Sequence, residues 1–154
     1  MTIAAILAEA RNRIGTMADF VAELTAKRDV ISALTERVAK FLAEFGVDAR
    51  AVHHVALVLD ELLTNVAAHG GTVEAPVSIR LTISTDRVTA EVVDGGMMFD
   101  PRVERNLDVS TSVEERPVGG LGLVLVRRVT EGLAYERVGD RNRTIFSICR
   151  APAG

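Results

Sequence analysis

Residues 55–70, which read VALVLDELLTNVAAHG, indicate a long central helix around which the rest of the chain is organised. Apolar side chains recur there at the spacing that places them on one face of a helix. Asp48 stands where it can cap the helix N-terminus, and Gly70 and Gly71 are a natural stop, because glycine accepts the left-handed conformation that closes a helix. The predicted core-facing stripe consists of Val52, Val55, Ala56, Leu59, Leu63 and Val66.

Two polar residues interrupt this apolar helix. Glu61 and Asn65 are four residues apart, so their side chains lie on the same face, one helical turn from each other. A carboxylate and an amide in apolar surroundings must be hydrogen-bonded, paired or directed at a ligand. The alternative interpretation is the solvated edge of an amphipathic helix, and this pair alone does not decide between the two.

The size and charge of the chain limit the classes of protein to consider. Its 154 residues, 48% of them apolar, are enough for one well-packed domain. A net charge of −3 and a pI of about 5.6 argue against a nucleic-acid partner, which would require a basic face. Cys149 is the only cysteine, which excludes an internal disulfide and fits a reducing cytoplasm. We expect no membrane span and no signal peptide, because we find neither a sufficiently long apolar run nor a basic N-terminal region.

The N-terminal part of the chain contains two further helical patterns. Residues 2–14 predict a short amphipathic helix within an extension that covers residues 1–19. Residues 20–24 are consistent with a short first strand. Residues 29–45 have a broad apolar face and are followed by Gly46, which predicts a scaffold helix without chemistry of its own.

Residues 77–83, in which apolar and polar residues alternate, and two turn sequences predict two antiparallel hairpins. The first pairs residues 77–83 with 88–93, and the second pairs residues 133–138 with 143–150 across a turn at residues 139–142. Together with the helices, these segments predict an α+β fold. We expect a two-layer sandwich, in which a mixed, mostly antiparallel sheet carries helices on one face, within a domain that spans residues 20–150.

A carboxylate and two glycines follow the second predicted strand. Asp94 at a strand end before Gly95 and Gly96 is an ordinary turn in many proteins. A functional interpretation is that the carboxylate accepts a hydrogen bond from an exocyclic amine such as that of adenine. A neighbouring glycine then lets the backbone approach the flat ring closely.

A long polar segment separates this turn from a glycine-rich helix start. Residues 100–118 are irregular, which is typical of a functional lid or a disordered insertion. The glycines that follow, at positions 119, 120 and 122, open a predicted helix whose free amide groups could bind phosphate, although a glycine cluster can also be a hinge. The segment lacks the lysine of a P-loop and the preceding strand of a dinucleotide fingerprint.

Taken in order, the three motifs resemble a known nucleotide-binding family. Glu61-x-x-x-Asn65 on a helix, Asp94-x-Gly96-x-x-Phe99 after a strand and Gly120-x-Gly122 at a helix start are similar to the GHKL (Bergerat-type) ATP-binding fold of histidine kinases and gyrase-type ATPases. The run from Asp60 to Gly70 and the Phe99-Asp100-Pro101 sequence further resemble the RsbW/SpoIIAB-type anti-sigma serine kinases. This resemblance covers about residues 20–150.

The resemblance implies a role for each matching residue. Asn65 matches the asparagine whose side-chain oxygen binds Mg²⁺, and Glu61 matches the catalytic general base. Asp94 matches the adenine-reading aspartate, and Gly96 matches the glycine beneath the ring. The residues expected to contact ATP or ADP are Asn65, Asp94, Gly96, Phe99, Arg116, Gly119, Gly120, Leu121 and Gly122, with Arg116 near the γ-phosphate.

The family also implies partners and leaves alternatives open. We expect a STAS-domain antagonist as the phosphorylated partner, a sigma factor as a second partner, and a homodimer. The alternatives are a binding module that is gated by ATP without catalysis, and a detached histidine-kinase or ATPase catalytic domain. His53 and His54 lie inside the domain rather than on a separate dimerisation hairpin, which argues against a phosphoacceptor role. Met97 and Met98 are bulkier than the residues usual at that turn, and the N-terminal extension is longer than usual.

Overall fold

The computed structural model describes residues 2–12, 18–69, 76–103 and 120–152. The predicted end of the central helix at Gly70 and Gly71 and the segment at 104–119 lie outside these residues. In chain order, the elements are α1 (Ile3–Asn12), β1 (Ala18–Leu24), α2 (Arg28–Glu44), α3 (Ala49–His69), β2 (Val77–Ile83), β3 (Arg87–Asp94), α4 (Gly120–Val129), β4 (Gly132–Val138) and β5 (Arg141–Cys149).

The strands form one five-stranded sheet in the order β1-β2-β3-β5-β4. Every neighbouring pair is antiparallel, so the sheet is more regular than the mixed sheet that we expected. The reason is that β2–β3 and β4–β5 are both hairpins, and β5 lies beside β3 in the opposite direction. The α+β sandwich is confirmed, as are both hairpins.

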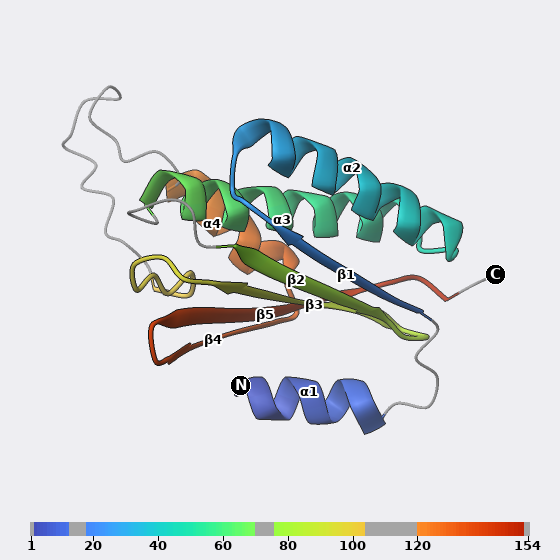
Figure 1. The fold of residues 1–154 in the computed structure, drawn as a ribbon. Helices are drawn as coiled ribbons and strands as arrows, with labels where there is room; N and C mark the ends of the chain where they lie inside the picture. Colours follow the sequence, from blue (N-terminus) through green and yellow to red (C-terminus); the bar gives the residue numbers. More distant parts are fainter. Residues whose placement is uncertain (1, 13–17, 70–75, 104–119, 153–154) are drawn as a thin grey trace.

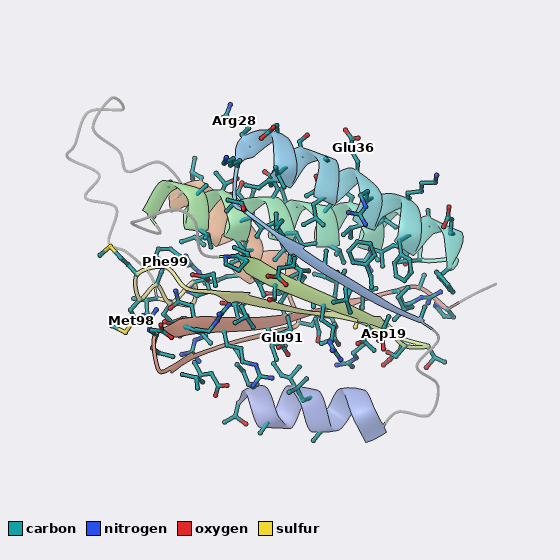
Figure 2. All side chains as sticks on the ribbon, in the orientation of Figure 1. Asp19, Arg28, Glu36, Glu91, Met98 and Phe99 are labelled. Atoms are coloured by element: carbon teal, nitrogen blue, oxygen red, sulfur yellow. The ribbon has the colours of Figure 1, made fainter. Side chains whose placement is uncertain are left out.

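The helices do not all lie on one face of the sheet. Helices α2, α3 and α4 cover one face, as expected, whereas α1 lies against the other face (Figure 1). Ile3 and Ile6 of α1 are buried with Ala134 and Ile145, which form an apolar area on the outer face of β4 and β5. Glu91 of β3 points to this same side (Figure 2). The expectation of helices on one face is therefore corrected for α1, which covers an area that would otherwise be exposed.

Helix α3 forms the centre of the larger core. Its residues Val55, Leu59 and Leu63 have no exposed surface, and they pack with Leu81 and Phe146 of the sheet in one cluster. Burial of each such side chain contributes about 1.5–3 kcal/mol relative to exposure. This packing fixes the axis of α3, and so determines where its polar residues point.

The start of α3 is held by the side chain that the sequence predicts. Asp48 Oδ1 accepts a hydrogen bond from the backbone N–H of Ala51 at 3.1 Å, which is an N-cap. Its second oxygen accepts from the N–H of Ala151 at 2.8 Å, which ties the C-terminal segment to α3. These bonds lower the pKa of the Asp48 carboxyl.

One helical segment among the described residues, Ala49–Ala68 of α3, is long and apolar enough by length and composition to span a membrane. The expectation from the sequence that no run reaches this length is therefore not met. Because α3 packs against both the sheet and α2 as the core helix of the fold, its apolar composition is the one that this position requires.

Candidate functional site

A pocket opens between α3 and the end of the sheet where β3 and β5 meet. It encloses about 400 Å³, its open mouth included. Leu62, Val66 and Val92 form apolar walls, and the polar groups come from α3 and from both strands. The lining residues are Leu62, Asn65, Val66, Val92, Asp94, Met97, Phe99, Pro101, Asn142 and Thr144. An apolar cleft with a few polar groups is typical of a small-molecule site.

Asn65 presents an oxygen to this pocket. The residue is 7% exposed, and its Nδ2 donates to the backbone oxygen of Glu61 at 2.8 Å. Because only the NH₂ end of an amide can donate, this bond fixes the orientation of the side chain. Oδ1 has no hydrogen bond within the described part of the chain and remains available as a metal ligand.

Asp94 presents an acceptor at the other end of the pocket. It is 6% exposed, and its Oδ1 accepts from the N–H of Gly96 and from Asn142 Nδ2, each at 2.9 Å. No hydrogen bond to Oδ2 occurs among the described residues. Asp94 therefore has one oxygen held by the protein and one for a ligand. Because an ionised carboxylate is purely an acceptor, that ligand must supply a donor.

Glu61 lies against the start of α4. A Cβ atom placed on Gly122 would be 2.9 Å from Glu61 Oε1, and closer still to Oε2 and Cδ, so only glycine leaves room for this carboxylate. Burial raises the pKa of the Glu61 carboxyl, and the charge of Asp60 raises it further. No hydrogen bond or ion pair to the carboxylate occurs among the described residues. A raised pKa in a cleft is a mark of functional carboxylates.

The structure thus brings together residues that are far apart in the sequence. Asn65, Asp94 and Phe99 line the pocket, and Gly96 lies in the turn that caps Asp94. Glu61 meets Gly122 one helical turn from Asn65. These positions agree with the predicted arrangement, although contact with a nucleotide stays a prediction.

Other predicted residues are placed differently or are not described. Gly120 begins α4, whereas the side chain of Leu121 is 73% exposed and is not among the pocket-lining groups. Arg116 and Gly119 lie outside the described residues. Met98 and Phe99 lie in the loop that follows β3 (Figure 2), and Met98 is exposed while Phe99 lines the pocket.

Four further polar residues of the site were missed from the sequence. Asn142 and Thr144 of β5 line the pocket, and Tyr135 and Arg137 of β4 reach Asn142 behind it. We interpreted Asn142 as a turn residue, because asparagine is common in turns. The alternation of β5 offered a signal, because it places residues 142 and 144 on the same face as the core residue Phe146.

Comparison with known proteins identifies the family and the fold of the chain. Residues 24–148 match the model of the histidine kinase-like ATPase domain. The serine/threonine-protein kinase BtrW of Bordetella bronchiseptica is 30% identical over 106 residues, which cover 68% of this chain and 75% of that protein.

A solved structure shows the same fold. The RsbU and RsbW domains of a Mycobacterium tuberculosis protein match with a TM-score of 0.64 at 14% identity, covering 89% of this chain. The match spans only 34% of that longer chain. The family match extends from β1 to β5 and includes α3, Asp94 and α4. The chain therefore belongs to the histidine kinase-like ATPase family, and the resemblance of its motifs to GHKL proteins is confirmed.

Proposed function

We propose that this protein is an ATP-dependent, Mg²⁺-requiring serine/threonine protein kinase and anti-sigma regulatory factor of the cytoplasm. Its substrate is a STAS-domain antagonist that competes with a sigma factor in a partner-switching pathway. The observation that carries the proposal is the position of Glu61. Its carboxylate has a raised pKa and no hydrogen-bond partner among the described residues, and it lies one turn from Asn65, against the start of α4.

The free atoms of the pocket fit ATP and Mg²⁺. Asn65 Oδ1 can serve as one metal ligand, and Mg²⁺ commonly takes few protein ligands and completes its shell with water and phosphate oxygens. Asp94 Oδ2 can accept the exocyclic amine of adenine between apolar walls. The N–H groups of the first turn of α4, which have no partner within the helix, suit phosphate.

Glu61 supplies the proton acceptor that transfer to a serine needs. The serine oxygen forms a bond to the γ-phosphorus, the bond from this phosphorus to the leaving oxygen of ADP breaks, and the serine proton passes to Glu61. A carboxyl with a raised pKa is a better proton acceptor near neutral pH than an ordinary glutamate. Asn65 would hold a metal that neutralises charge, and phosphoryl transfer depends mainly on positioning and electrostatic stabilisation.

A second function, a nucleotide-gated binding module without catalysis, is supported by a different observation. The side chains of Met97, Met98 and Leu121 are 67%, 73% and 73% exposed, respectively. Exposed apolar side chains of this kind mark protein-binding surfaces when they gather in a patch. In this case ATP would alter the affinity for a partner, and no phosphate would be transferred.

The two functions are separated by incubating purified protein with labelled ATP and a purified STAS-domain protein. Glu61→Gln should bind Mg-ATP and the partner normally, with transfer slowed by about 10²- to 10⁴-fold. Asn65→Ala should lose Mg-ATP binding and transfer together. Thr64→Ala, which changes an exposed α3 residue outside the pocket lining, is the matched control. If the wild type binds the partner in an ATP-dependent way but transfers no phosphate to it, the kinase function is refuted and the binding module is supported.

We also propose a homodimer that uses the sheet or the N-terminal segment. The supporting feature is β1, which is an edge strand of the sheet and carries Val21 with 65% of its surface exposed. Edge strands present unpaired backbone groups that favour pairing with another chain. Light scattering should give twice the monomer mass in the micromolar range, and a strict monomer there would contradict the proposal.

A further inference from the structure

A hydrogen-bond network from the β4–β5 hairpin lies directly behind Asp94. Asn142 is its centre and is only 3% exposed. Asn142 Oδ1 accepts from the Tyr135 hydroxyl at 2.6 Å and from Arg137 Nη1 at 2.9 Å. Asn142 Nδ2 donates to Asp94 Oδ1 at 2.9 Å and to the Met97 oxygen at 2.8 Å. Every polar atom of the Asn142 side chain is therefore engaged.

The network allows only one orientation of the Asn142 amide. Its oxygen faces two donors, and its NH₂ group faces acceptors only, namely Asp94 Oδ1 and the backbone oxygens of Gly96 and Met97. Rotation of the amide by half a turn would set its oxygen against these acceptors. Since unsatisfied buried groups cost about 1–3 kcal/mol each, the observed orientation is strongly preferred.

This orientation determines which oxygen of Asp94 a ligand can use. The N–H of Gly96 and Asn142 Nδ2 both bind Oδ1, so that Oδ2 alone is left for the pocket. Arg137 Nη1 also donates to the Gly96 oxygen at 2.7 Å, which anchors the turn beside Asp94. The carboxylate and the turn are thus held by the same hairpin.

We propose that Asn142, oriented by Tyr135 and Arg137, is a specificity-determining positioning residue. It holds Asp94 as a single-oxygen acceptor and thereby selects purine nucleotides that present an exocyclic amine. The inference rests on the proposed nucleotide-binding function and adds the residues that set its base selectivity. These residues do not touch the reacting atoms.

Among the residues that the structure describes, few titratable groups surround the network. Asp94 lies in front of it, and Tyr135 and Arg137 lie behind it. Beyond Tyr135, Asp100 forms an ion pair with Arg102, whose guanidinium carbon lies 6.0 Å from the centroid of the tyrosine ring. Burial raises the pKa of the Tyr135 hydroxyl, which therefore remains a donor up to and beyond neutral pH. The residues of α3 that line the pocket, Leu62, Asn65 and Val66, do not titrate.

The test compares two ligands, Mg-ATP and the Mg complex of purine riboside triphosphate, which lacks only the exocyclic amine. A hydrogen bond to a charged acceptor contributes about 1.5–3 kcal/mol, so the wild type should prefer ATP by about 10- to 150-fold. Asn142→Asp sets a second carboxylate against Asp94, and such a pair shares one proton, which is lost as the pH rises. Its affinity for ATP relative to the wild type should therefore fall as the pH rises, by up to about tenfold per pH unit for one coupled proton.

Two further variants keep the inference testable. Tyr135→Phe removes one donor to Asn142 Oδ1 and should lower the preference for ATP over purine riboside triphosphate about 3- to 10-fold. The substitution removes the hydroxyl group and with it the hydrogen bond to Asn142. Asp140→Asn changes an exposed carboxylate at the turn of the same hairpin, and should leave preference and pH profile unchanged.

The outcomes distinguish this inference from the proposed function. If the wild type binds no Mg-ATP, the proposed function fails and the inference fails with it. If the wild type prefers ATP but Asn142→Asp keeps the same preference and a flat relative pH profile, only the inference is overturned. If Asn142→Asp does not fold by circular dichroism, Tyr135→Phe decides, and an unchanged preference in that variant overturns the inference.

Discussion

Gly122→Ala tests the role of Glu61 without changing Glu61 itself. Gly122 lies in the first turn of α4, and the methyl group of alanine would overlap the Glu61 carboxylate. The clash is with the end of a flexible side chain, so Glu61 can rotate away while the backbone stays in place. The substitution therefore moves the proposed base, while the carboxyl group of Glu61 itself stays unchanged.

The size of the displacement follows from the structure. Even Oε1, the most distant of the three overlapping atoms, would be 2.9 Å from the new methyl carbon. Ordinary contact requires about 3.5 Å, so Oε1 must move by about half an ångström and Oε2 by more than about 1 Å. A misplacement of about 1 Å can cost about 10²-fold in rate. Alanine is favoured over glycine in a helix by about 1 kcal/mol, so we expect no loss of stability.

The assay measures single-turnover transfer of labelled phosphate to the STAS-domain partner, with Mg-ATP affinity measured by calorimetry. Gly122→Ala should slow transfer about 10²-fold at nearly unchanged affinity. Leu125→Ala, one turn further along α4 at an exposed position, is the control for changes in the helix. In a Glu61→Gln background, Gly122→Ala should add little, because residues that act as a unit are not additive.

Two results would refute this reasoning. Wild-type transfer by Gly122→Ala would mean that the observed position of Glu61 is not the one that serves catalysis. A loss of Mg-ATP affinity, together with a further large loss of transfer in the Glu61→Gln background, would mean that Gly122 acts on the phosphates directly rather than through Glu61.

Three further predictions follow from single side chains. Asp94→Asn replaces a pure acceptor by a group that also donates, and should weaken Mg-ATP binding about tenfold or more by calorimetry, whereas retained affinity contradicts the adenine assignment. Glu61→Gln should raise the melting temperature near neutral pH, since the raised pKa of Glu61 in the folded state means that its ionisation destabilises the fold. This gain in melting temperature should vanish below the ordinary glutamate pKa of 4.5, and a gain independent of pH would contradict this cause. Asp48→Ala removes the cap on Ala51 and the bond to Ala151, and should cost about 0.5–2 kcal/mol at neutral pH. Because the pKa of Asp48 is lowered in the fold, this difference should shrink as the pH falls below its ordinary value of 3.8, and denaturant titrations at two pH values measure it.

The main elements could be predicted from the sequence because their signals are local. The period of the apolar residues predicted α3 with its N-cap at Asp48, and alternation in residues 77–83 together with the turn sequences predicted both hairpins. The position of α1 could not be predicted in this way. Its apolar stripe shows that it packs on something, but the surface that it covers is formed by Ala134 and Ile145, which are far away in the chain.

The site was predicted in part for the same reason. Glu61 and Asn65 are neighbours on one helix, so their spacing in the sequence is also their spacing in the fold. The partnership of Asn142 with Asp94 spans 48 residues and arises from the register of β3 with β5, which pairs these two residues directly. No local pattern contains this register, and a turn-forming asparagine is the simpler interpretation until the strands are paired.

The three predicted functional side chains share a property that the sequence alone does not show. Asn65 Oδ1, Asp94 Oδ2 and the Glu61 carboxylate are all acceptors without a hydrogen bond within the described part of the chain. A ligand that satisfies them must bring a cation or a donor to each, whereas its negative groups must go to the N–H groups at the start of α4. A metal-bound nucleotide with an exocyclic amine, together with a hydroxyl that gives up its proton, meets all of these requirements at once. A free phosphate or a carboxylate ligand offers only negative groups for the N–H groups at the start of α4. We therefore favour a nucleotide over other anions for this pocket.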